Sequence, residues 1–239
     1  MEFKHLYRTK IEKSFDEDQS KILETFKGLF KLGKTEIMLL NYYQGVPLSL
    51  PARIVSVYRT FMRLDVHPQQ AVAFEKDRHT FIRCGAFQHD ICADIHHIDV
   101  FERNATLGNF FFAEILADRR NAIRLVLDSP TEASFDVEGV KVSGSLMDIS
   151  IEAAAIKVLQ LPGFDKGFIT RLQLKLPNNI QNSCVTTHVV ARLVATKELD
   201  DGFLCIFSIK QGNGPDQPLS KFIFRRQVEL IRALKDHSI

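Results

Sequence analysis

The sequence predicts a mainly β protein: two small antiparallel β-barrels in tandem, with an N-terminal amphipathic helix and a C-terminal helix. Three observations predict this class. Short apolar segments recur between glycines and prolines through most of the 239 residues, as is typical of antiparallel barrels. The two ends of the chain instead show the three- to four-residue apolar spacing of helices. With 45% hydrophobic residues, the chain can also bury a sizeable core.

The N-terminal segment, residues 1–33, is predicted to be helical from residue 14 to residue 33. Ser14 and Glu17 form an S-x-x-E capping box, and Gly33 is a plausible end. Large apolar residues follow at four-residue spacing: Ile22, Phe26 and Phe30. We expect this helix to pack on its own domain, because amphipathic helices mostly face a core. Docking of a partner or formation of a homodimer through the helix is the alternative.

The first barrel is predicted over residues 34–113. Its clearest strand-like segments are Thr35–Leu40, Ala52–Val57, Phe61–Val66, Ala71–Phe74 and Thr80–Cys84. Residues 104–118 are expected to join the two halves. A run of three phenylalanines within them is too apolar for a free linker. We expect those phenylalanines to fill a seam between the domains, and residues 114–118 to form the linker itself.

The second barrel with its C-terminal helix is predicted over residues 119–239. A hairpin turn is expected at Glu138–Gly139, a further turn at Gln211–Pro215, and a helix beyond Pro218. The remaining strands are expected at Ala154–Leu161, Phe168–Leu176, Cys184–Thr196 and Phe203–Ile209. Together these strands have the size of a closed antiparallel meander.

Composition limits the classes of function. A net charge of +2 and a pI near 8.3 give no strong nucleic-acid signal, so any anion site must be local. Four cysteines without C-x-x-C spacing indicate buried, reduced thiols. The sequence contains no apolar run as long as a membrane span, and its first residues lack an apolar signal core. We therefore expect a cytoplasmic protein.

Neither a metal centre nor an active site is predicted. Cysteines and histidines gather between His79 and His97, but they lack the paired spacing of structural or catalytic zinc sites. The sequence also lacks a nucleophile elbow, a Walker loop and a histidine metal motif. We therefore expect a binding protein without a cofactor rather than an enzyme.

The candidate ligand site begins with three arginines before an apolar run. Arg119, Arg120 and Arg124 fall within six residues of one another. A guanidinium group is planar and permanently charged, so it suits bidentate bonds to phosphate and stacking on flat rings. The same R-x-x-x-R spacing occurs at Arg59 and Arg63, which shows that the spacing alone is a weak signal.

A second segment, residues 147–153, makes the signal more specific. Strand alternation places Asp148 and Ser150 on one face. The carboxylate can accept the ring N–H groups of a guanine, and the hydroxyl can bond a phosphate or carbonyl oxygen. Arginines for phosphate and a carboxylate for a base edge together indicate a nucleotide.

The two motifs together resemble those of the PilZ domain, the receptor module for cyclic di-GMP. The family pattern is R-x-x-x-R followed by [D/N]-x-S-x-x-G, and Arg120, Arg124, Asp148 and Ser150 match it. Ala153 stands where the family has glycine. Glycine is used where backbone approaches a ligand or takes a positive φ, so a Cβ there can crowd the ligand or strain the turn.

The resemblance implies a receptor with no catalytic role. A barrel placed before a PilZ domain resembles the flagellar-brake type, which implies cyclic di-GMP bound at the inter-domain hinge. It also implies signalling by domain rearrangement to a protein partner, such as a flagellar motor or regulatory protein, in bacterial motility or biofilm control. An arginine just before R-x-x-x-R, here Arg119, suits a stacked pair of nucleotides, so two ligands per chain are expected.

Three alternatives remain open. The arginines can pair with neighbouring carboxylates on a solvated surface, while Asp148 and Ser150 cap a turn. The barrel can be a degenerate PilZ scaffold that binds protein partners without nucleotide, a reading that Ala153 favours. Least favoured is a nucleic-acid-binding regulator that uses the basic C-terminal helix.

Overall fold

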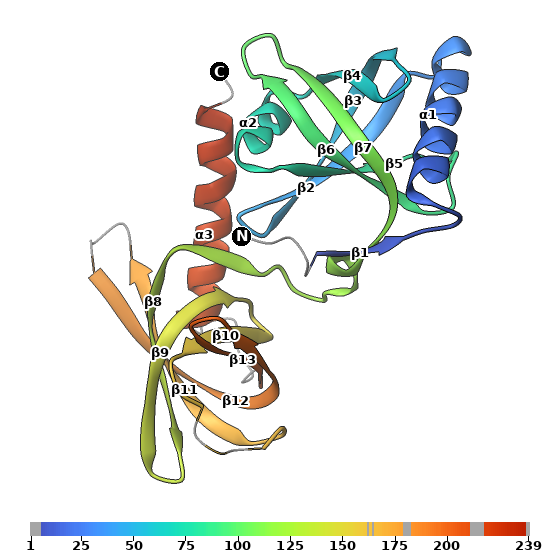
Figure 1. Ribbon diagram of the computed structural model, residues 1–239. Coiled ribbons are helices and arrows are strands. Elements are labelled where there is room, and N and C mark those ends of the chain that lie inside the picture. Colours follow the sequence, from blue (N-terminus) through green and yellow to red (C-terminus); the bar gives the residue numbers. More distant parts are fainter. Residues whose placement is uncertain (1–5, 162, 164, 179–182, 211–217, 238–239) are drawn as a thin grey trace. The chain divides into compact units, whose positions relative to one another are not determined.

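The computed structural model describes residues 6–161, 163, 165–178, 183–210 and 218–237, and it confirms the mainly β fold class with a helix near each end (Figure 1). The chain divides into two compact units. The first contains residues 1–43, 47–121 and 231–239, and the second contains residues 44–46 and 122–230. Neither unit is one continuous stretch of sequence.

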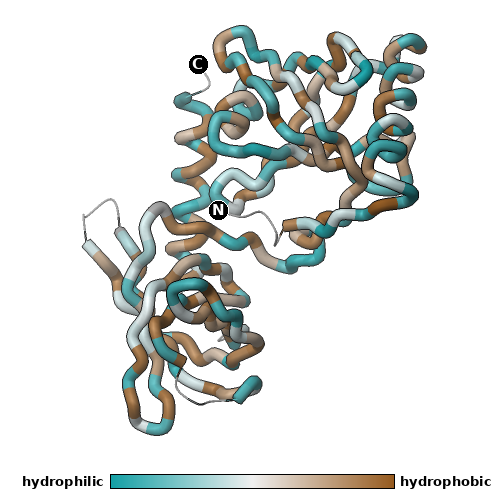
Figure 2. The backbone as a smooth tube through the Cα atoms, viewed as in Figure 1, coloured by the Kyte–Doolittle hydropathy of each residue, from teal (hydrophilic) through white to brown (hydrophobic). Residues whose placement is uncertain are grey.

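The first unit is built on a seven-stranded sheet in the order β1-β7-β4-β3-β2-β5-β6. A further pairing between β6 and β7 closes the strands from β7 to β6 into a ring and leaves β1 outside it. The strands are β1 (Tyr7–Lys10), β2 (Glu36–Tyr43), β3 (Val46–Val57), β4 (Phe61–Val66), β5 (His79–Arg83), β6 (Asp90–Asp99) and β7 (Asn104–Ile115). Figure 2 shows hydrophobic residues recurring along these strands, as a sheet curled around a core requires.

Helix α1 (Phe15–Lys31) confirms the sequence prediction at both ends. Ser14 is the N-cap, its hydroxyl accepting a hydrogen bond from the backbone N–H of Glu17 at 3.3 Å, and Gly33 follows the helix at positive φ. Ile22 and Phe26 are fully buried in the core of the same unit. The helix therefore packs on its own domain, as expected.

Helix α2 (Pro68–Lys76) corrects the strand predicted at Ala71–Phe74. His67 is the N-cap and Pro68 occupies the first turn, where a missing N–H costs nothing. All four residues from Ala71 to Phe74 are buried. A short segment buried on every side has no amphipathic period, so apolar content alone does not distinguish helix from strand.

Strand β7 corrects the seam predicted at residues 104–118. Instead of a join, Asn104–Ile115 is a long strand that pairs with β1, β4 and β6. Phe110 and Phe112 are buried in the first unit's own core, and Phe111 contacts Tyr7 and Phe15. Residues 116–119 then form a short 3-10 helix, η2 (Leu116–Arg119).

A buried polar network links β2, α2 and β5. The side-chain oxygen of Asn41 accepts hydrogen bonds from Gln70 at 2.6 Å and Thr80 at 2.7 Å. Its amide donates to a carboxylate oxygen of Asp77 at 2.7 Å and to the carbonyl oxygen of His79 at 2.8 Å. Burial raises the pKa of Asp77 to about 6, opposed by the Asn41 hydrogen bond and by His79.

We expect Asp77→Asn to flatten the pH dependence of the first unit's stability. Since folding raises the carboxyl pKa, its stabilising contribution is complete below pH 4 and is lost as pH rises through 6. Between those limits the wild type should lose about 2 kcal/mol, a value discounted for the partial exposure of Asp77. Urea unfolding at several pH values measures this. The exposed Glu75→Gln on the same helix is the control, and equal slopes in wild type and Asp77→Asn would contradict the prediction.

The second unit is a closed antiparallel barrel in the strand order β10-β13-β12-β11-β8-β9. The strands are β8 (Leu125–Val137), β9 (Val140–Ile149), β10 (Ala153–Val158), β11 (Ile169–Asn178), β12 (Ser183–Leu199) and β13 (Gly202–Ile209). The interior is filled by large apolar side chains such as Phe135 and Phe207, whose rings meet edge to face with centroids 5.1 Å apart. This confirms the predicted closed antiparallel barrel, but the predicted meander is wrong: β10 pairs with β13 and β11 pairs with β8, so the strands do not follow chain order around the barrel.

Two tight turns shape the barrel. The predicted hairpin turn lies at Glu138–Gly139, where both residues have positive φ. A second two-residue turn joins β12 to β13, because Leu199 pairs directly with Gly202. The turn predicted at Gln211–Pro215 falls outside the described residues.

Helix α3 (Pro218–Asp236) confirms the helix predicted beyond Pro218. Within the second unit it buries Leu219, Phe222, Ile223 and Leu230. No helix in the described part of the chain has the length and apolar character needed to cross a membrane.

The cysteines only partly follow the prediction. All four are free thiols, and Cys92 and Cys205 are buried. Cys84 is half-buried and Cys184 is exposed on β12, so the expectation of four buried thiols is wrong for these two.

Candidate functional site

Arg119 and Arg120 belong to the first unit, at the end of η2. The guanidinium of Arg119 donates to the carboxylate of Glu114, a pairing that the sequence did not reveal. Arg119 is 67% exposed, and an exposed ion pair is worth only about 0–1 kcal/mol. An anionic ligand could therefore replace Glu114 as the partner of Arg119 at small cost.

Arg120 lies close to a polar cluster that includes Tyr42. The Tyr42 hydroxyl donates to Asp118 at 3.2 Å, and Arg83 donates to the same carboxylate. Burial raises the pKa of Tyr42, the charge of Asp118 raises it further, and the charges of Arg83 and Arg120 act in the opposite direction. This places the Arg120 cation near the η2 end of the first unit.

Arg124 and Asp148 belong to the second unit, Arg124 just before β8 and Asp148 on the neighbouring strand β9. Arg124 directly precedes β8, whose first residue, Leu125, pairs with Ile149 of β9. Asp148 pairs with Val126 on one side and Ala155 of β10 on the other. The carboxylate thus lies on β9, and the arginine lies at the start of the strand that is hydrogen-bonded to β9.

Ser150 does not continue the strand alternation. Strand β9 ends at Ile149, and Ser150 is buried at 1% exposure in the turn that leads to β10. Its hydroxyl accepts hydrogen bonds from the backbone N–H groups of Glu152 at 3.2 Å and Ala153 at 2.9 Å. The expectation that Ser150 shares a face with Asp148 is wrong, because its side chain caps this turn.

Ala153 begins β10 in ordinary backbone geometry. It is not among the residues with positive φ. Its N–H is held by Ser150, and its carbonyl oxygen accepts from the Ser150 N–H at 2.8 Å. The turn therefore does not require glycine for conformational reasons. Ala153 therefore differs from the motif glycine only by the space that its Cβ occupies.

One open cavity brings the two motifs together. It has a volume of about 410 Å³, within the range of roughly 300–1,000 Å³ typical of small-molecule sites. Arg124 from the first motif and Ala153 from the second line it together. The other lining residues come from the same turn and from β12 and β13: Glu152, Val194, Ile206, Phe207, Ser208 and Ile209.

Sequence reasoning missed the part of the cavity formed by β12 and β13. These strands lie far along the chain, and barrel closure brings them to Ala153. Alternation could have identified the outward residues of each strand. It could not have shown which of them meet Ala153, since the register shifts at a bulge between Leu193 and Ala195.

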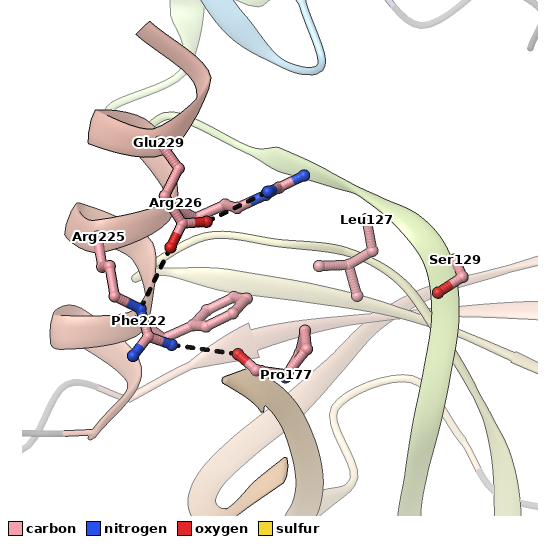
Figure 3. A pocket seen from close by; sticks show the side chains of 7 residues that line it. All are labelled: Leu127, Ser129, Pro177, Phe222, Arg225, Arg226 and Glu229. Atoms are coloured by element: carbon pink, nitrogen blue, oxygen red, sulfur yellow. Dashed lines mark hydrogen bonds and ion pairs between the residues drawn. The ribbon is translucent and has the colours of Figure 1, made fainter. Parts of the chain in front are cut away.

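A second cavity, beside α3, is too small for a nucleotide. Its volume is about 80 Å³ (Figure 3). The Glu229 carboxylate forms ion pairs with both arginines that line this cavity, at N–O distances of 3.7 Å to Arg225 and 3.2 Å to Arg226. Arg225 also donates to the carbonyl oxygen of Pro177 at 3.2 Å. Arg225 thereby connects the helix to β11 of the barrel.

Comparison with protein-family models and with curated proteins finds no match for this sequence. Among solved structures, the chain is similar to the Bacillus subtilis inhibitor of motility MotI/DgrA, with 14% identity, coverage of 82% of this chain and 97% of that chain, and a TM-score of 0.41. It is also similar to YcgR from Escherichia coli in complex with c-di-GMP, with 14% identity, 90% and 93% coverage, and a TM-score of 0.43. For the K. pneumonia MrkH–c-di-GMP complex the identity is 14%, the coverage 91% and 96%, and the TM-score 0.38.

Proposed function

We propose that this chain is a cyclic di-GMP receptor that binds the nucleotide on its second unit and passes the signal to a protein partner. The observation that carries the proposal is the shared cavity. Arg124 and Ala153 come from two motifs separated by a strand–turn–strand segment, yet they line one surface beside the strand that holds Asp148. This arrangement supports a single site to which both motifs contribute.

The chemistry of the lining suits a guanine nucleotide. Arg124 offers planar N–H donors to a phosphate. Asp148, and Glu152 at the cavity itself, offer carboxylates to the N–H groups of a guanine edge. Val194 and Ile206 provide apolar surface against which a flat base can lie. These are recognition groups, and the proposed activity includes no chemical reaction.

Titration calorimetry of the full chain with cyclic di-GMP tests the proposal. Saturable binding is expected, while GTP and cyclic AMP as comparison ligands should give at least tenfold weaker binding. A wild-type protein that gives no heat with cyclic di-GMP, and no change in thermal unfolding temperature at high ligand concentration, would disprove the proposal.

We further propose that binding couples the two units. The boundary between them falls after Asn121, inside the R-x-x-x-R motif. A ligand that binds both Arg120 and Arg124 is therefore tied to both units. Such coupling requires that the ligand prefer one arrangement of the units, since it shifts an equilibrium only by its differential affinity. Small-angle scattering with and without ligand tests this, and superimposable curves would contradict it.

Ala153→Gly is expected to tighten cyclic di-GMP binding about threefold to tenfold. The backbone at Ala153 has no positive φ, so the substitution removes only the Cβ from the cavity lining and gives the ligand more room. Calorimetry on both proteins measures the ratio of affinities. Ala154→Gly is the control, because Ala154 is buried in the barrel interior. Unchanged or weaker binding by Ala153→Gly would show that the Cβ is no obstacle.

Arg119 is expected to support a second, stacked nucleotide. Its guanidinium is exposed and paired only with the half-buried Glu114, so it can turn to a ligand. We expect two ligands per wild-type chain and a shift towards one ligand in Arg119→Leu. Glu114→Gln, which frees the arginine, should keep two ligands. Calorimetric stoichiometry decides, and a value of one for the wild type would remove this role from Arg119.

A degenerate scaffold that binds a protein without nucleotide is the second candidate. The observation that favours it is the position of Ser150, whose hydroxyl is used inside the turn. For either candidate, a flagellar motor or regulatory protein in motility or biofilm control is the proposed class of partner. The same calorimetric titration separates the two candidates.

A further inference from the structure

Strand register places an arginine that belongs to neither motif beside the candidate site. Ala153 of β10 pairs with Ser208 of β13, and Ser208 pairs with Arg192 of β12. Residues that face one another across antiparallel strands share a face of the sheet. The three residues therefore form one row across β10, β13 and β12, which are adjacent in the barrel.

This row lies on the outer face of the barrel. Ser208 and Arg192 are exposed. The next row, Ala154, Phe207 and Leu193, is buried inside the barrel. Ala153 and Ser208 both line the candidate cavity, and Arg192, which is not itself a lining residue, is the neighbour of Ser208 in the row.

Arg124 occupies the opposite edge of the same cavity. It precedes β8, which is two strands from β10 in the direction away from β12. Arg192 is also two strands from β10, about 10 Å across the sheet at the usual strand spacing. A ligand lying over Ala153 thus has one arginine on each side, and Val194 and Ile206 provide apolar surface in the cavity lining.

Arg192 is available to a ligand. In the part of the chain that the structure describes, its side chain takes part in no hydrogen bond or ion pair. Two lysines on neighbouring barrel strands are engaged, Lys157 by Asp201 and Lys175 by Glu132. An exposed arginine beside the candidate cavity keeps its full donor capacity for an anion.

We propose that Arg192 binds the second phosphate of the ligand, so that Arg124 and Arg192 hold a doubly anionic cyclic dinucleotide from its two sides. This inference rests on the proposed function and adds to it a residue outside both motifs. It also gives a reason for selectivity: a mononucleotide, with its phosphate at one end, engages only one of the two arginines.

The test compares three variants of the full chain by calorimetry with cyclic di-GMP. Arg192→Gln should weaken binding about tenfold or more, and Arg192→Lys should recover part of the loss because it keeps the charge. Arg171→Gln is the matched control. Arg171 is exposed on β11, one strand beyond β12 and displaced along it, opposite Val190. Its substitution should leave affinity within about twofold.

The outcomes separate the two proposals. Normal wild-type binding with equal affinity in Arg192→Gln would overturn the role of Arg192 and leave the receptor function standing. Equal losses in Arg192→Gln and Arg171→Gln would also overturn it, because they would indicate a general effect of surface charge. A wild-type protein that does not bind cyclic di-GMP would disprove the receptor function, and the role of Arg192 with it.

Discussion

Arg124→Ala is expected to weaken cyclic di-GMP binding at least about tenfold, because a charge-assisted phosphate contact is worth roughly 1.5–3 kcal/mol. Arg124 is the motif arginine that lines the candidate cavity, so its loss should be felt whether one or two nucleotides bind. Arg120→Ala should cause a loss of similar size if the ligand also reaches the first unit. Calorimetry of both variants measures these effects.

Arg120 and Arg124 belong to different units, so their variants show whether the ligand binds one unit or both. If Arg124→Ala is damaging and Arg120→Ala is neutral, the site belongs to the second unit alone and binding does not couple the units. Wild-type affinity in both variants would discard the motif assignment. Arg63→Ala serves as the control, since Arg63 has the same R-x-x-x-R spacing but lies on β4, where its guanidinium rests over the ring of Tyr58.

Gly202→Ala is expected to cost the second unit about 3–5 kcal/mol, which combines a strained backbone and a steric clash. Gly202 has φ of +136°, a region that residues with a Cβ rarely adopt. A Cβ at this position would lie 2.4 Å from the carbonyl oxygen of Val158 on β10. Because that oxygen belongs to the backbone of a paired strand, it cannot move aside as a side chain would.

Two further glycines separate the causes of this loss. Gly139 has φ of +84° but open space around it, so Gly139→Ala should show the backbone cost alone, about 1–2 kcal/mol. Gly163 has neither restriction, and Gly163→Ala should change stability by no more than about 0.5 kcal/mol. Denaturant unfolding of the three variants tests the order, and a tolerated Gly202→Ala would show that the β12–β13 turn can relax.

The fold was predictable where a local signal had one physical meaning. The capping box at Ser14 predicts a helix start, and the Glu138–Gly139 pair predicts a tight hairpin turn. The structure shows the helix cap at Ser14 and positive φ at both turn residues. The prediction failed for α2 because the buried segment Ala71–Phe74 carries no amphipathic period. It failed for β7 because a strand with neighbours on both sides has the same apolar content in sequence as a segment that fills a seam between two domains.

The candidate site was predictable to a similar extent. Arg124 and Ala153 could be named from motif spacing, and the structure places both at one cavity. Ser150 was misplaced because strand alternation was extended one residue past the end of β9. Arg192 could not be found from the sequence, since only the register of three strands, including a bulge in β12, places it beside Ala153.

The division of the chain has a consequence for synthesis and folding. Residues 231–239 belong to the first unit, although the rest of that unit is translated before the barrel. The β1–β7 pairing in the first unit also joins segments far apart in sequence, and such contacts close slowly. By contrast, the second unit has all of its residues once Leu230 has left the ribosome. The unit that is synthesised first therefore receives its last residues only after the barrel has all of its own.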